Sequence, residues 1–131
     1  MKPDISSRED IKNVITKFYN LLLDDQLMMP FFEEIVQKNE LEHHLEIITD
    51  FWHDILFDTN EYHQNVMQKH LQKHAFITFK KEHFTRWVSY LFTIIDAAFI
   101  GENSERMKAR AQSIATIMQL KMNLYQDKKQ I

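Results

Sequence analysis

Cysteine is absent from this 131-residue chain, and glycine and proline are scarce, with one and two residues respectively. Without cysteine the chain has no disulfide, no thiolate metal site and no catalytic thiol. A single glycine cannot supply a glycine-rich phosphate loop, a dinucleotide-binding fingerprint or the tight hairpin turns of a β-rich fold. Because two prolines leave few helix breakers, the composition predicts an all-α protein.

An excess of one charge sign and long apolar runs are also lacking. The formal net charge is −3 with histidine counted as neutral, which gives no electrostatic basis for binding nucleic acid. No apolar run approaches the roughly 20 residues that span a bilayer, and the first residues contain no apolar signal core. We therefore expect no nucleic-acid partner, no membrane partner and a cytoplasmic location. The length predicts a single domain over residues 1–131.

Apolar residues recur at helical spacing along the chain. The first predicted helix begins at a capping box formed by Ser6 and Glu9 and ends at residues 24–26. A short second helix starts beside Pro30. This short helix covers residues 31–36. The helices predicted after it cover residues 41 to about 58, 63–74 and 79–100, and the last one begins at residue 103 or 104.

Two features mark the last two helix ends. Gly101 lies just past the apolar stripe of the 79–100 helix, where a left-handed C-cap residue is expected. Asn103 or Ser104 is expected to cap the last helix with its own side chain.

Four residues with polar groups lie on apolar faces of different predicted helices: Tyr19, His44, His70 and Trp87. His44, for example, shares a face with Ile48, four residues later. Taken singly, each such residue is more often a packing residue than a functional one. Together they could form a site.

Three kinds of site use such residues. His70 and His74 are spaced as two zinc ligands on one helix, but no third ligand follows at a fixed spacing. Glu40 and His43 have the spacing of one half of a di-iron bundle site, without a second copy. Ten phenylalanines and inward histidines on two helices fit an apolar slot for haem, with one neutral imidazole on the iron.

The order of residues resembles the truncated haemoglobins, specifically the third group of that family. The similarity covers roughly residues 8 to 125. It rests on the following segments: Lys17-Phe18-Tyr19, Pro30-Phe31-Phe32, His44, Phe51-Trp52, Tyr62 to His70, His83-Phe84-Thr85-Arg86-Trp87 and Arg110 to Met118. The resemblance implies a truncated globin fold, a short helical sandwich around one haem b (iron protoporphyrin IX).

The resemblance also assigns roles to residues. His70 matches the proximal histidine that binds the iron, with His74 as the alternative ligand. Tyr19, His44 and Trp87 match the distal residues around the bound ligand. The residues expected to contact the haem or lie just behind its distal side are Phe32, Ile48, Phe51 and Trp52.

Two segments depart from the family pattern. Gln64-Asn65-Val66-Met67 stands where the family commonly has Gly-Asn-Pro-Met, so the proximal helix is expected to begin earlier. Thr85 stands where aspartate is common. Candidates for binding the haem propionates are Lys69, Lys73, His74 and Arg86, and the sequence does not choose among them.

The activity implied by the resemblance is binding of dioxygen, nitric oxide and other diatomic ligands. Detoxification of nitric oxide, as in a nitric oxide dioxygenase, and peroxidase-like or other redox chemistry are compatible with it. Either would need an external reductase, because the chain has no flavin or nicotinamide motif. The alternative is a haem-free, globin-like sensor or helical interaction domain, in which His44 and His70 only pack.

Overall fold

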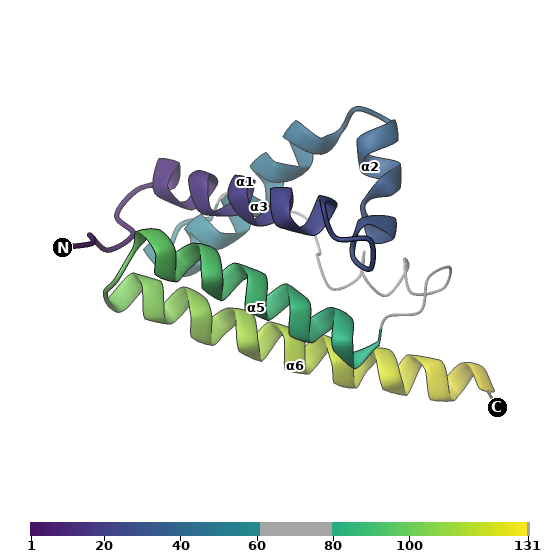
Figure 1. The fold of residues 1–131 in the computed structure, drawn as a ribbon. Helices are drawn as coiled ribbons and strands as arrows, with labels where there is room; N and C mark the ends of the chain where they lie inside the picture. The colour runs from purple at the N-terminus through teal and green to yellow at the C-terminus, as the bar shows by residue number, and fades with distance from the viewer. Residues whose placement is uncertain (61–79, 131) are drawn as a thin grey trace.

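The computed structural model of the chain is drawn in Figure 1. The structure describes the backbone of residues 1–60 and 80–130, and within those ranges the side chains up to residue 121. The elements are, in chain order, α1 (Arg8–Leu23), η1 (Met29–Phe31), α2 (Glu33–Gln37), α3 (Leu41–Phe57), α5 (Lys81–Ala98) and α6 (Glu102–Gln130). No strand occurs in the described ranges, and the all-α prediction is confirmed. The helix predicted over residues 63–74 lies outside the described residues.

The long helices form two layers. α5 and α6 run antiparallel side by side, and α1 and α3 pack on them from the other layer (Figure 1). α1 contacts both α3 and α5, so it lies at the centre of the core. Its buried face has the predicted helical spacing and consists of Ile11, Val14, Ile15, Phe18, Tyr19 and Leu22.

Ion pairs across the outer face of α1 and α3 add to this apolar contact. The Arg8 guanidinium lies 2.5 Å from an Asp50 carboxylate oxygen and 2.9 Å from one of Glu46. Lys12 lies 2.8 Å from Glu42 and also contacts Glu46. These side chains are partly exposed, so solvent screens each pair and its contribution to stability is small. Their main effect is to fix how α1 lies along α3.

The first helix begins one residue later than predicted. Ser7, and not Ser6, is the N-cap, and its hydroxyl accepts a hydrogen bond from the Asp10 amide at 3.1 Å. The Asp10 carboxylate in turn accepts from the Ser6 amide at 3.0 Å. The Ser6–Glu9 capping box is therefore wrong, because Asp10 takes the role expected of Glu9.

The predicted helix over residues 31–36 is divided into two parts. Pro30 lies in the 3₁₀ helix η1, and the Phe32 amide bonds to the Met29 carbonyl at 2.9 Å. Phe32 then has φ −118° and ψ 0°, which interrupts the helix before α2 begins at Glu33. The resulting sharp corner directs Phe31 and Phe32 into the core, where both are buried.

The turn between α5 and α6 depends on the N-terminal segment. Gly101 has φ +144°, which is not the left-handed C-cap conformation that was predicted. A Cβ atom at Gly101 would lie 2.5–2.8 Å from side-chain atoms of Asp4. The Asp4 carboxylate accepts from the amides of Asn103 and Ser104 at 2.8 and 2.9 Å. Asp4 therefore caps α6, and the prediction that Asn103 or Ser104 does so is wrong.

We expect Gly101→Ala to lower the free energy of unfolding by about 1–3 kcal/mol, because it combines backbone strain with a clash against Asp4. Urea denaturation measures this loss. Ser113→Ala, an exposed change in the middle of α6, is the control and should stay within about 0.5 kcal/mol of the wild type. Equal stability of Gly101→Ala and the wild type would contradict the assigned turn.

Candidate functional site

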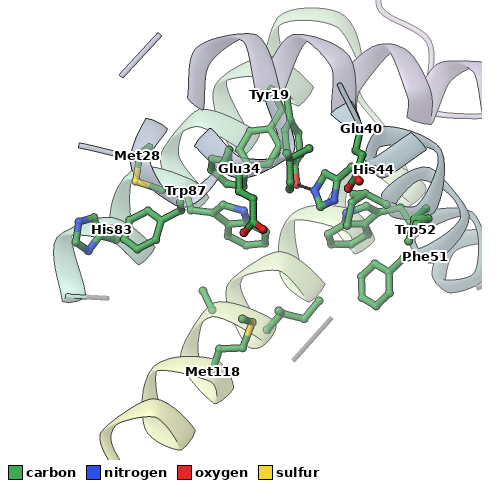
Figure 2. Close-up of a pocket in the computed structure, with 18 of the residues that line it drawn as sticks. Tyr19, Met28, Glu34, Glu40, His44, Phe51, Trp52, His83, Trp87 and Met118 are labelled. Atoms are coloured by element: carbon green, nitrogen blue, oxygen red, sulfur yellow. Dashed lines mark hydrogen bonds between the residues drawn. The ribbon is translucent and has the colours of Figure 1, made fainter. Parts of the chain in front are cut away.

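A cavity of about 490 Å³ lies between the two helical layers. Small-molecule and cofactor sites typically measure about 300–1,000 Å³ and have mostly apolar walls with a few polar groups. Residues from α1, the corner around η1, α3, α5 and α6 form the walls, and Figure 2 shows their side chains converging. The apolar and aromatic members include Phe18, Tyr19, Met28, Phe31, Phe32, Ile35, Ile47, Ile48, Phe51, Trp52, Phe84, Trp87, Ile114, Ala115 and Met118.

Tyr19 brings a hydroxyl group into this apolar wall from α1. Its side chain is buried, and its ring makes an edge contact with Phe32 at a centroid distance of 5.3 Å. Burial raises the pKa of the Tyr19 hydroxyl well above its ordinary value. The phenol therefore stays protonated at ordinary pH and keeps one O–H to donate.

His44 is the hydrogen-bond partner of Tyr19. Its Nε2 atom lies 2.8 Å from the Tyr19 hydroxyl oxygen, the bond drawn as a dashed line in Figure 2. The bond can run in either direction, depending on the imidazole tautomer. If Nε2 accepts, the Tyr19 proton is held by His44. If Nε2–H donates, the Tyr19 proton can point elsewhere, including into the cavity.

Trp87 adds an indole N–H to the same cavity from α5. It is half-buried, and its ring makes an edge contact with Phe18 at a centroid distance of 5.7 Å. The structure thus brings together three of the predicted site residues, Tyr19, His44 and Trp87, from three helices (Figure 2).

The four side chains expected at or behind the haem also line the cavity. Trp52 is 3% exposed, and Phe51 packs edge-on against it at a centroid distance of 5.4 Å. Phe32 is buried beside Tyr19, and Ile48 is half-buried on α3. These four side chains make the wall apolar around the Tyr19–His44 pair. Hydrogen bonds are stronger in such apolar surroundings.

The expected iron ligand, His70, lies outside the described residues, as does the alternative, His74. Lys69 and Lys73, two candidates for the propionates, lie in the same segment. Arg86 is described, and its Nη1 atom pairs with the buried carboxylate of Asp25 at 2.6 Å. Arg86, one of the four candidates for binding the haem propionates, therefore already pairs with a carboxylate of the protein.

His83 is a cavity residue that the sequence analysis did not single out. It is buried, and its ring meets Phe31 edge-on at a centroid distance of 4.8 Å. Its Nδ1 atom accepts a hydrogen bond from the Lys80 amide at 2.7 Å, and burial lowers the pKa of His83. His83 is therefore neutral with its proton on Nε2. The sequence signal that points to His83 is its position four residues before Trp87, which puts both side chains on the same face of the helix.

Among the side chains that the structure describes, no group of three or more His, Asp or Glu residues could hold a metal ion. Glu40 precedes α3 and His43 lies on its exposed side, at the rim of the cavity. Over the same residues, every helix is too short or too polar to span a membrane.

A solved structure gives the fold a name. The chain is similar to the group III truncated hemoglobin from Campylobacter jejuni, with a TM-score of 0.81 and 24% sequence identity. The likeness covers 93% of this chain and 95% of that one. No family model matches the chain, and no curated protein does so either. The chain therefore has the truncated globin fold, as the sequence predicts.

The buried phenol predicts a pH effect on stability. A tyrosine whose pKa is higher in the folded state stabilises the fold fully below about pH 10, its unfolded value, and progressively less above it. We therefore expect the free energy of unfolding to fall as the pH rises above about 10, and to fall less steeply in Tyr19→Phe.

Urea denaturation at several pH values measures both slopes. The difference between wild type and variant isolates Tyr19 from Tyr90 and the lysines, which titrate in both proteins. Parallel slopes would show that the Tyr19 hydroxyl is not held protonated by burial.

Proposed function

We propose that this chain is a haem-binding truncated globin of the third group, and that it binds dioxygen, nitric oxide and other diatomic ligands. The observation behind this proposal is the cavity, in which an apolar, aromatic wall surrounds the hydrogen-bonded pair of Tyr19 and His44. The truncated globin fold supports the same conclusion, but a fold by itself does not define an activity.

The residues of the cavity fit a haem. Its volume of about 490 Å³ suits a flat organic cofactor, and aromatic side chains from three helices provide apolar contact. The polar pair itself is a hydroxyl and an imidazole, and the carboxylates of Glu34 and Glu40 also line the cavity. We propose that His70 holds the iron, that Tyr19, His44 and Trp87 surround the ligand, and that Phe32, Ile48, Phe51 and Trp52 contact the haem or lie behind its distal side.

Haem iron with one protein ligand supplies an open coordination position where a diatomic molecule can bind. The chain's own residues then determine how that molecule is held. The Tyr19 hydroxyl donates to a partly negative ligand when His44 donates its own Nε2–H to the phenol oxygen. Trp87 supplies a second donor through its indole N–H, and Phe51 and Trp52 exclude water.

We extend the proposal to chemistry on the ligand. Two donors directed at a partly negative ligand slow its release, which suits oxygen-dependent conversion of nitric oxide, or peroxide chemistry, better than oxygen carriage. Multiple turnovers need electrons, so a separate reductase is part of the proposal. Rapid conversion of the oxygenated form to the ferric form on mixing with nitric oxide, with nitrate as product, would support the first of these reactions.

The proposal predicts that the purified protein, or the protein after addition of haemin and removal of unbound haemin by gel filtration, shows a Soret absorption band. His70→Ala should abolish or greatly weaken that band, because the iron loses its protein ligand. His74→Ala tests the alternative ligand and should keep the band. A protein that stays colourless after haemin addition would instead favour a haem-free sensor or interaction domain.

A second prediction concerns ligand release. Tyr19→Phe should speed oxygen dissociation about fivefold, as expected when a hydrogen bond contributing about 1 kcal/mol is lost. Stopped-flow displacement of oxygen by carbon monoxide measures the rate. Thr116→Val, which removes an exposed hydroxyl on α6, should leave it unchanged. An unchanged, fast rate in Tyr19→Phe would remove Tyr19 from the proposed role.

A further inference from the structure

Asp25 is a buried acidic residue in the corner between α1 and η1, and it is not part of the cavity wall. Its side chain is 6% exposed. A carboxylate so far from water normally needs several hydrogen-bond donors and a positive partner. Asp25 has both, and they come from two separate parts of the fold.

The two carboxylate oxygens of Asp25 have different partners. Oδ1 accepts from the backbone amides of Leu27 and Met28, at 2.7 and 3.3 Å. Oδ2 accepts from Nη1 of Arg86 at 2.6 Å and from the hydroxyl of Tyr90. The bonds of Oδ1 therefore stabilise the turn of the corner, and the bonds of Oδ2 join the corner to α5.

The charge of Asp25 is maintained by these bonds. Burial alone would raise the pKa of its carboxyl, but the hydrogen bonds from Tyr90, Arg86 and Leu27 outweigh it and lower the pKa to about 2. Asp25 is therefore ionised at any ordinary pH, and so is the Arg86 guanidinium beside it. Removing Arg86 would leave the buried Asp25 carboxylate without its positive partner, whereas the Arg86 side chain is 48% exposed and can be solvated.

Both elements that Asp25 joins form walls of the cavity. The corner contributes Met28, Phe31 and Phe32, and α5 contributes His83, Phe84 and Trp87. Trp87 directly follows Arg86 in the sequence and lies three residues before Tyr90. The two residues that bond to Asp25 therefore lie on either side of Trp87 in the sequence. Their bonds hold this turn of α5 against the corner.

We propose that Asp25 is a positioning residue for the ligand pocket: through Arg86 and Tyr90 it sets where Trp87 lies against the corner and α1. Asp25 does not itself line the cavity. Its effect on ligand binding rests on the proposed haem function, whereas its effect on Trp87 does not. Without Asp25, the Arg86–Tyr90 turn of α5 loses its bonds to the corner, and the Trp87 ring shifts from its edge contact with Phe18.

An ion pair at the other end of α5 offers a matched control. Lys108 lies 2.7 Å from Asp96, joins α6 to α5, and contacts no residue of the cavity wall through this bond. Asp96→Asn therefore removes a carboxylate that, like Asp25, pairs with a cation and joins α5 to another part of the fold. It tests whether any loss of charge on α5 has the effect expected of Asp25.

The experiment uses the protein labelled with 5-fluorotryptophan and observed by ¹⁹F NMR without haem. The chain has two tryptophans, so Trp52→Phe assigns the two resonances. In Asp25→Asn and in Tyr90→Phe the Trp87 resonance should shift by more than its linewidth, while the Trp52 resonance on α3 stays in place. In Asp96→Asn both resonances should match the wild type.

A Trp87 resonance that is unmoved in Tyr90→Phe and Asp25→Asn would overturn the proposal. If Asp25→Asn does not fold, Tyr90→Phe decides alone, because it removes one hydrogen bond and no charge. An equal shift in Asp96→Asn would also overturn it, since the effect would then be general to α5.

The haem-loaded proteins test the link to ligand binding. Oxygen dissociation should be faster in Asp25→Asn and Tyr90→Phe than in the wild type, and unchanged in Asp96→Asn. Unchanged rates together with a shifted Trp87 would overturn the effect on the ligand. If the wild type binds no haem, the proposed function fails, and the ¹⁹F result still decides whether Asp25 positions Trp87.

Discussion

The hydrogen bond between Tyr19 and His44 joins α1 to α3 at a largely apolar cavity, and the arrangement of the pocket depends on it. A buried phenol needs a partner, because an unpaired hydroxyl in an apolar site is costly. The ion pairs of Arg8 and Lys12 with α3 join the same two helices on their outer face. Since the direction of the Tyr19–His44 bond can reverse, the same pair can either hold its proton or offer it to a ligand.

Much of the fold could be predicted from periodicity. The end of α1, the start of α3 at Leu41 and the apolar face of α1 follow from local patterns. The convergence of Tyr19, His44 and Trp87 on one cavity was expected from family resemblance and from their places on apolar faces. Whether these residues act on a ligand stays a prediction.

The errors and omissions share a physical cause, which is contact between segments distant in sequence. Asp4 caps α6 about one hundred residues away, so local capping preferences misplaced the cap on Asn103 or Ser104. Asp24 and Asp25 look alike as loop residues, yet only Asp25 is buried, because Arg86 and Tyr90 reach it from α5. Local sequence patterns do not show which distant residues become partners in the fold.

The central claim is that the cavity between the layers is a haem site, and fluorescence titration of the apoprotein with haemin tests it most directly. Trp52 and Trp87 both line the cavity, and haem quenches nearby indoles by energy transfer. Fluorescence should fall almost to zero at one equivalent of haemin. Fluorescence that persists at one equivalent, or declines only gradually with excess haemin, would contradict it.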